Sequence, residues 1–381
     1  MATGKARRSR EGHLDFVRRM LTRHGNGNPR LRQTLRLNIG SSLERMGQWS
    51  AAVREYRGAL VESKREARRR SGPLGADMLA EMRSRLSLLA SRRGHRESAE
   101  AFLRTNRRGL KFALRRWPGE ECFVHRLGDT GRRLAALARS RHGEDAAHKA
   151  LRSSIRDLEA LASRSPASLA VQAEIAESCV ALADVCEWQH REARAEVAFA
   201  RAAAIYGTLL SVAPTDAFRM GLALAVQDLG RLALASRRTG RARSLFTRAL
   251  ELMLGVGDIA SYLQAEPLRL ASCVHWLART CQIGGYEDAR RRSLQAFVAY
   301  EAAARRGPKG RKWRDFGLDV AGYGTELCAW LMRAAREVGR DWEVAGYRRR
   351  GHALLLALGW RLPRDDREYH ARMLDREARD P

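Results

Sequence analysis

Four arginines stand near expected helix ends, each two residues before a glycine. They are Arg45, Arg92, Arg141 and Arg238, followed by Gly47, Gly94, Gly143 and Gly240. A guanidinium donates two parallel hydrogen bonds to a carboxylate or phosphate, so a row of arginines at equivalent positions would bind acidic ligands. Asn38 and Arg85 lie about two helical turns earlier and extend this candidate site. The alternative is that each cation complements its helix dipole, which is worth ~0.3 to 1 kcal/mol.

A second kind of chemistry would use the basic runs of the chain to bind nucleic acid. These runs are Arg68 to Arg70, Arg107 and Arg108 with Lys111, Arg115 and Arg116, Arg290 to Arg292, and Arg348 to Arg350. Nucleic-acid binding needs cations for the phosphates, and base stacking needs aromatic side chains beside them. Only Phe112 and Trp117 are interleaved with such a run, and no RNA-binding or DNA-binding signature is visible. The alternative is a solvated helix face.

Metal chemistry is the third candidate, around Cys179, Cys186 and His190. These residues are seven and four positions apart and share one helix face, and Glu187 forms an E-x-x-H pair with His190. Di-iron helical bundles use such pairs, but they need a second copy, which this chain lacks. Ile175 extends the two cysteines into an apolar stripe, which favours a core face. We expect no metal and no cofactor, and the absence of phosphate-binding and nucleophile motifs argues against an enzyme.

The arginines are positioned by a pattern of paired helices that is clearest between Leu35 and Leu60. Apolar residues recur at helical spacing in both halves of this stretch, and Gly47 separates the halves. The stripes are Leu35, Ile39, Leu43 and Met46, then Ala52, Val53, Tyr56, Ala59 and Leu60. Small residues such as Gly40 let two helices approach closely, and Tyr56 fills the space between them. The stretch therefore predicts a helical hairpin.

The turn glycines recur along the chain with a period of about 48 residues. They are Gly47, Gly94, Gly143, Gly240, Gly285 and Gly339. The period requires one more turn near residue 191, where Trp188 to Arg194 is polar between two apolar stretches. In the fifth unit Gly240 comes three residues late, so we expect the turn to have moved there. The pattern predicts about seven antiparallel hairpins.

The residues at Ile39, Gly40, Leu43, Gly47, Trp49, Ala52, Tyr56 and Ala59 match the alternation of small and large positions in one repeat family. The stretch resembles a tetratricopeptide repeat, and the likeness is good in units one and six and fair in unit five. The resemblance implies an all-α solenoid, wound as a right-handed superhelix, whose concave groove holds ligands and is faced by the arginine row. The usual repeat has about 34 residues, so these hairpins should be taller.

The net charge of +28 comes almost entirely from arginine. A GC-rich genome explains arginine in place of lysine, but it does not explain the deficit of Asp and Glu, so an acidic partner is indicated. The six cysteines show no C-x-x-C spacing and suit a reducing compartment. No apolar run reaches the ~18 residues of a membrane span. We therefore expect a cytoplasmic protein with no membrane contact.

These observations divide the chain into three parts. Residues 1–29 form a basic N-terminal segment, 30–363 the repeat array, and 364–381 a charged capping helix on the last hairpin. Our interpretation is a non-enzymatic scaffold or adaptor that binds a peptide or an acidic protein surface in its groove, in bacterial signalling. The alternative is a helical array that binds nucleic acid through its basic surface.

Overall fold

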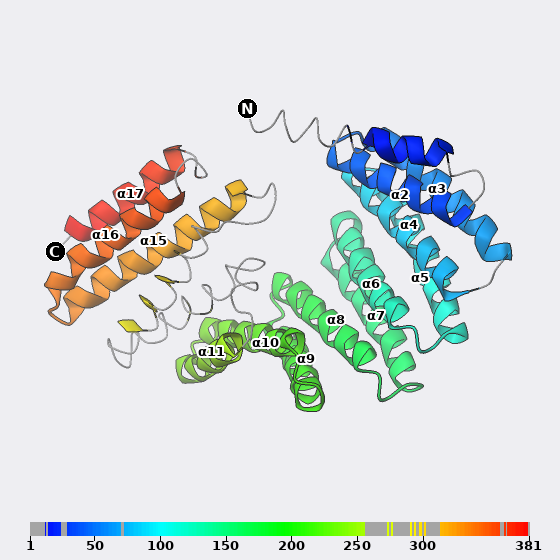
Figure 1. Cartoon of the computed structure of the whole chain (residues 1–381). Coiled ribbons are helices and arrows are strands. Elements are labelled where there is room, and N and C mark those ends of the chain that lie inside the picture. Colours follow the sequence, from blue (N-terminus) through cyan, green and yellow to red (C-terminus); the bar gives the residue numbers. More distant parts are fainter. Residues whose placement is uncertain are drawn as a thin grey trace. The chain divides into compact units, whose positions relative to one another are not determined.

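The computed structural model describes residues 14–23, 29–69, 72–255, 313–358 and 364–379, with Gly12, Leu362 and scattered positions between 273 and 301. Every regular element in these ranges is an α-helix (Figure 1). The chain divides into two compact units, Met1–Arg191 and Glu192–Pro381. The all-α repeat fold predicted from the sequence is confirmed. The hairpin predicted around Gly285 lies outside the described residues.

The first unit is a row of helical hairpins. Its labelled helices are α2 (Pro29–Arg45), α3 (Trp49–Arg69), α4 (Pro73–Arg92), α5 (Arg96–Arg116), α6 (Glu121–His142), α7 (Glu144–Ala162) and α8 (Leu169–Trp188). Each helix contacts the next along the chain, and α6 also contacts α4 and α8. The first helices of successive hairpins, α4, α6 and α8, are therefore neighbours in one layer, and the second helices follow them in another (Figure 1).

The second unit contains two groups of helices. They are α9 (Glu192–Val212), α10 (Asp216–Ala235) and α11 (Thr239–Leu254), and then α15 (Trp313–Glu337), α16 (Asp341–Leu358) and α17 (Arg364–Arg379). Helix α10 packs on α9 and α11, and α17 packs on both α15 and α16, with the fully buried Leu374 beside Gly351 of α16. The second helices α3, α5, α7, α9 and α11 begin 47 or 48 residues apart, as the sequence period predicts.

The hairpin turns hold one residue in the left-handed conformation. Gly94 has φ +77°, and the following His95 N–H donates to Ala90 O at 2.8 Å, an arrangement that satisfies the last carbonyls of a helix. At the turn predicted near residue 191, His190 takes the left-handed place with φ +54°. The period therefore located a turn that has no glycine.

The expected displacement of the fifth turn to Gly240 is wrong. Arg237 has φ +57°, and Arg238 N–H donates to Ala233 O at 2.8 Å, whereas Gly240 lies inside α11. The turn thus keeps the period, 47 residues after His190. The hydrogen bonds that end α10 determine which residue takes the left-handed conformation. Here that residue is an arginine and not a glycine.

Glycines set the closest approaches between the two helices of a hairpin. A Cβ at Gly40 would lie 2.6 Å from Cε1 of Tyr56, and one at Gly230 would lie 2.9 Å from Cε1 of Phe246. Both aromatic side chains are fully buried. The packing that the sequence suggests for Gly40 and Tyr56 is therefore present, and it recurs in the second unit.

Helix α9 has the length and apolar composition that crossing a membrane requires, and among the described residues it alone does so. Its Ala195, Phe199 and Tyr206 are buried, and its Glu196 pairs with Arg238 of α11. The core helix of a repeat array has the same composition, so one such helix is weak evidence for a membrane.

Candidate functional site

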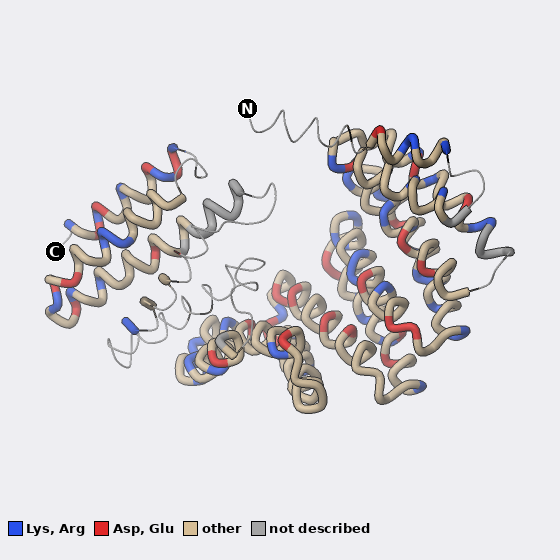
Figure 2. Tube along the Cα trace, viewed as in Figure 1, with Lys and Arg blue, Asp and Glu red and all other residues tan. Residues whose placement is uncertain are grey.

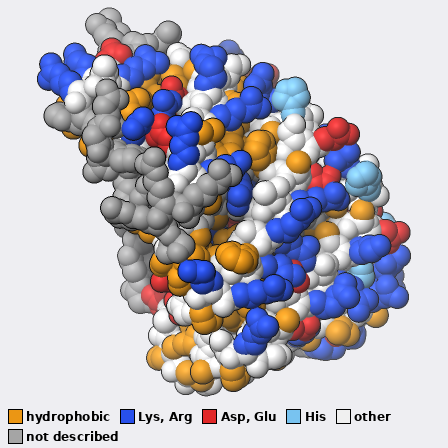
Figure 3. Space-filling model, turned by 90° about the vertical axis from the view of Figure 1, so that its right-hand side faces the viewer, with side chains coloured by type: hydrophobic (Ala, Val, Ile, Leu, Met, Phe, Trp, Pro, Cys, Tyr) orange, Lys and Arg blue, Asp and Glu red, His pale blue; other side chains and the backbone are white. Residues whose placement is uncertain are grey.

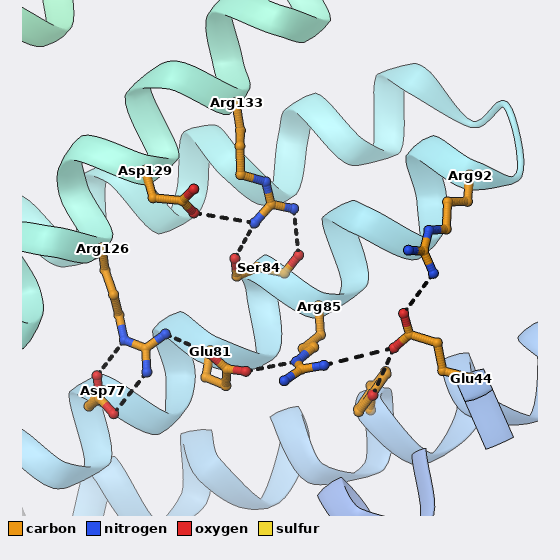
Figure 4. Close-up of polar contacts among 10 residues, drawn as sticks. Glu44, Asp77, Glu81, Ser84, Arg85, Arg92, Arg126, Asp129 and Arg133 are labelled. Atoms are coloured by element: carbon orange, nitrogen blue, oxygen red, sulfur yellow. Dashed lines mark hydrogen bonds and ion pairs between the residues drawn. The ribbon is translucent and has the colours of Figure 1, made fainter. Parts of the chain in front are cut away.

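A network of ion pairs and hydrogen bonds runs along the first helices α2, α4 and α6 (Figure 4). We call it the first-helix network; its labelled members are Glu44, Asp77, Glu81, Ser84, Arg85, Arg92, Arg126, Asp129 and Arg133. Glu44 of α2 receives Arg92 Nη1 at 2.9 Å on Oε1, and Arg85 Nη1 lies 4.0 Å from Oε2. The Tyr56 hydroxyl donates to the same Oε2 at 3.2 Å. Two arginines of one hairpin thus converge on a carboxylate of the hairpin before it.

The network continues from α4 to α6 through Arg126 and Arg133. Arg126 donates from Nε and Nη2 to the two carboxylate oxygens of Asp77, at 2.5 and 3.2 Å, and from Nη1 to Glu81. Arg133 donates to the hydroxyl of Ser84 and to its carbonyl oxygen, the latter at 3.0 Å. These bonds join first helices that lie one repeat apart in the sequence.

The electrostatics of the network show that its charges are balanced internally. Burial alone would raise the pKa of Glu81, but the hydrogen bonds from Arg85 and Arg126 outweigh it and hold that pKa below its usual value. Burial, together with the nearby carboxylate of Glu44, raises the pKa of Tyr56 to about 12. Glu81 is therefore ionised and Tyr56 neutral at physiological pH.

A third link joins α6 to α8 through Glu174. This carboxylate is only 7% exposed; it accepts Arg132 Nη1 at 2.7 Å and contacts His125 Nδ1 at 2.8 Å. Gly128 leaves the space, because a Cβ there would lie 1.8 Å from Glu174 Oε2. A buried carboxylate with such partners is a structural element, since leaving it unpaired would be costly.

The predicted site residues Asn38 and Arg45 are exposed on α2. They are seven residues apart, so they lie on one face of the helix, two turns from each other. Among the described residues, the one hydrogen bond of the Arg45 side chain is with Ser42 Oγ, at 3.5 Å from Nη2. These two side chains are therefore available to a ligand.

The other four predicted residues are engaged with carboxylates of the chain itself. Arg85 and Arg92 share Glu44, as described above. Arg141 reaches Glu100 and, at 3.2 Å, Glu97 at the start of α5, between two hollows of about 560 and 370 Å³. Arg238 in the second unit pairs with Glu196, 2.8 Å from Nη2 to Oε2.

The predicted row of equivalent arginines is therefore incomplete. Arg45, Arg92 and Arg141 each precede a left-handed glycine by two residues. Arg238 instead follows the left-handed Arg237, so it occupies another position of the repeat. The structure brings Arg85 and Arg92 together and places Arg141 in a separate cluster.

Unpaired positive charge lies on the second helices of the first unit. Nine exposed cations on α3, α5 and α7 make neither an ion pair nor a hydrogen bond with another described residue, and we call them the second-helix basic face. They are Arg54, Arg57, Lys64, Arg65, Arg108, Arg115, Lys149, Arg152 and Arg156.

Figure 2 shows Asp and Glu interspersed with Lys and Arg along the helices. On the face in Figure 3, Lys and Arg gather in rows and acidic side chains are sparse.

The sequence interpretation missed two stacks of arginine on tryptophan at the turn end of the hairpins. The Arg92 guanidinium lies 5.4 Å from the ring centroid of Trp49, and that of Arg139 lies 3.4 Å from that of Trp188. Each of these two tryptophans thus stacks with a cation of the chain, although part of its side chain is exposed. The available signal was the period, since Arg92 and Trp49, like Arg139 and Trp188, lie about one repeat apart.

The candidate metal site contains no ligand cluster. No group of three or more His, Cys, Asp or Glu side chains among the described residues could hold a metal ion. Cys179 and Cys186 are buried on α8, while His190 lies in the turn that follows. The apolar stripe is a core face, as the alternative interpretation predicts.

Comparisons with known proteins support the fold. No protein-family model and no curated protein sequence matches the chain. Among solved structures, BtubC (BKLC) from P. vanneervenii aligns with a TM-score of 0.50 and 18% identity, over 68% of this chain and 93% of that one. A STAND signal-transduction ATPase with a tetratricopeptide repeat sensor, PH0952 from Pyrococcus horikoshii, aligns with a TM-score of 0.53 and 11% identity, over 92% of this chain. The chain spans 46% of that protein's length.

Proposed function

Because this chain has a tetratricopeptide-like repeat fold, we propose that it is a non-enzymatic scaffold or adaptor that binds an acidic segment of a protein partner. Helical-repeat folds of this kind are protein-interaction scaffolds in general. The acidic nature of the partner is our inference from the net charge of +28. The likeness to a signal-transduction ATPase with a repeat sensor supports a role in signalling. That the signalling system is bacterial is part of the proposal.

The observation that carries this proposal is the division of charge between the two helix layers. Arg85, Arg92, Arg141 and Arg238 already contact carboxylates, so an acidic ligand would have to displace Glu44, Glu97, Glu100 or Glu196. The nine cations of the second-helix basic face have no such competitor among the described residues. We therefore assign the acidic partner to that face. Binding in the groove through Asn38 and Arg45 is the alternative.

A second candidate function, nucleic-acid binding, rests on the same basic face. Cations such as Arg108, Lys149 and Arg152 could neutralise phosphates. Base stacking is limited, because Trp49 and Trp188 already stack with Arg92 and Arg139, although Phe112 of α5 is exposed beside Arg108. We therefore rank a protein partner above a nucleic acid.

The proposed location is the cytoplasm. The five described cysteines are free thiols, and four of them are buried. Burial raises the pKa of Cys273 and of Cys328 to about 12, which makes both thiols unreactive. Such thiols suit a reducing compartment.

The test compares two double variants of the full chain against two labelled probes. Arg108→Glu with Arg152→Glu changes the second-helix basic face, and Asn38→Asp with Arg45→Glu changes the groove side. All four side chains are exposed, so both variants should fold. The probes are a peptide rich in Asp and Glu and a single-stranded oligonucleotide, and the readout is fluorescence anisotropy.

We expect the peptide to bind the wild type, to lose at least tenfold in affinity in the first variant, and to bind the second normally. Loss in the groove variant alone would move the site to Asn38 and Arg45. Tighter binding of the oligonucleotide, with affinity falling steeply as salt rises, would favour nucleic acid. Co-purification of partners from native extract, with and without nuclease, then identifies the partner.

A further inference from the structure

A cavity opens at the end of hairpin α4–α5 that lies away from its turn. Its volume is about 340 Å³, which is in the range of pockets for small ligands. The lining is mainly apolar and includes Leu79 of α4 and Leu110, Phe112 and Trp117 from α5 and its end. This cavity is separate from the first-helix network and from the second-helix basic face.

Two cations line the cavity, Arg83 and Arg116. The guanidinium of Arg116 lies 5.5 Å from the ring centroid of Trp117, whereas that of Arg83 is not neutralised. No carboxylate among the described residues lies within ion-pair distance of its guanidinium, and burial lowers its pKa because no anion offsets the loss of water. Arg85 and Arg126 are the contrasting cases, since carboxylates raise their pKa values. Gly109 makes room for the Arg83 guanidinium, because a Cβ there would lie 2.8 Å from Nη1.

The wall of the cavity also contains a buried hydrogen-bond acceptor that is unused. Asn106 lines it and is 1% exposed to solvent. Its Nδ2 donates to Thr130 Oγ1 at 3.3 Å, but its Oδ1 has no partner. A buried polar atom is rarely left unpaired in a folded protein, so a ligand that donates a hydrogen bond here would satisfy it.

We propose that this cavity binds a small amphipathic carboxylate that also carries a hydrogen-bond donor. The apolar body lies between Leu79 and Leu110, the carboxylate accepts hydrogen bonds from Arg83, and the donor reaches Asn106 Oδ1. The carboxylate is chosen because the planar fork of the Arg83 guanidinium matches two coplanar oxygens.

The experiment uses three related probes with the full chain. N-Octanoylglycine has the apolar chain, the carboxylate and an amide N–H; its methyl ester lacks the charge, and N-octanoylsarcosine lacks the N–H. Affinities are measured by isothermal titration calorimetry on the wild type. We expect the ester to bind at least tenfold more weakly than the acid, and the sarcosine about tenfold more weakly, as for the loss of one hydrogen bond to a buried acceptor.

Variants then assign the contacts. Arg83→Met keeps an apolar stem and should weaken N-octanoylglycine at least tenfold without changing the affinity of the ester. Arg104→Met, on the exposed side of α5, is the matched control and should bind as the wild type does. Asn106→Leu should bind the glycine and sarcosine compounds equally, and if it fails to fold, the probe comparison on wild type decides the donor contact.

Two outcomes would overturn the proposal. One is an ester that binds wild type as tightly as the acid does, which would leave only an apolar slot. The other is the absence of binding of N-octanoylglycine at millimolar concentration. Neither outcome would contradict the proposed binding of an acidic protein partner, because that proposal is tested with Arg108 and Arg152, which do not line this cavity.

Discussion

Glu44 and Arg92 lie 48 residues apart in the sequence, and their side chains meet at 2.9 Å. This separation is one repeat, so the pair joins the ends of the first helices of two successive hairpins. Other pairs have similar separations: Arg126 with Asp77, Lys111 with Asp157 and Arg333 with Glu377 are 49, 46 and 44 residues apart. Several basic side chains thus cross-link neighbouring repeats.

The first prediction concerns Arg126, which holds Asp77 and Glu81 together. Arg126→Ala leaves two half-buried carboxylates without their shared cation, and we expect the free energy of unfolding to fall by about 1–2 kcal/mol. The measurement is urea unfolding of the full chain followed by circular dichroism. Arg104→Ala is the control, because its exposed pair with Glu100 within one helix is worth only ~0.2–0.5 kcal/mol. Equal effects of the two substitutions would contradict the network.

The second prediction is a pH dependence that originates at Glu81. Its pKa in the folded protein is lower than the unfolded value of 4.5, so the unfolded state binds more protons in the interval between the two. The stabilisation is therefore complete above pH 4.5 and is lost as the pH falls through the lowered pKa. Wild type should exceed Glu81→Gln in unfolding free energy at pH 7, and the gap should narrow on acidification. A gap that is independent of pH would refute this assignment.

The third prediction concerns the left-handed Arg237. A non-glycine residue in this conformation costs ~1–2 kcal/mol, and glycine returns part of the gain through its larger unfolded-state entropy. We expect Arg237→Gly to stabilise the protein by about 0.5–1 kcal/mol, measured as an increase in Tm. The matched control is Arg248→Gly, at an exposed position within α11, which should destabilise by ~1 kcal/mol. A destabilised Arg237→Gly would mean that the side chain has a role in the turn.

The fourth prediction concerns the contact between Gly230 and Phe246. Gly230→Ala places a methyl group about 2.9 Å from the ring, so overpacking should destabilise by ~1–3 kcal/mol. Adding Phe246→Leu should restore part of the loss, as a double-mutant cycle of unfolding free energies would show. Gly240→Ala, which has nothing within 4 Å, should be neutral or slightly stabilising. Additive effects at Gly230 and Phe246 would rule out the steric explanation.

The sequence predicts the repeat fold well because helix periodicity and turn position are local properties. The period even locates the turn at His190, which has no glycine. Glycine as a marker of the turn fails at Gly240, because a glycine inside a helix looks the same in the sequence as a glycine that ends one. The left-handed residue there is Arg237, which only the hydrogen bonds after α10 identify.

The candidate site could be predicted only in part. The sequence predicts that Arg85 and Arg92 lie near one another. It does not show that both form ion pairs with Glu44, because that depends on how far side chains reach between hairpins. A search for opposite charges one period apart would have found this carboxylate. The same search could not show that Arg83 has no carboxylate partner, since that depends on which groups are absent around a buried side chain.

The cross-links between repeats occur in both helix layers. Arg126 connects α6 to α4 among the first helices, and Arg107 connects α5 to α7 among the second, with its Nε 2.8 Å from Asp157 Oδ2. A hairpin that unfolds therefore removes partners from its neighbours on either side. In a nearest-neighbour description, these bonds add to the coupling between repeats. We expect the first unit to lose its structure in one cooperative step under mechanical load, and not by peeling hairpin by hairpin from an end.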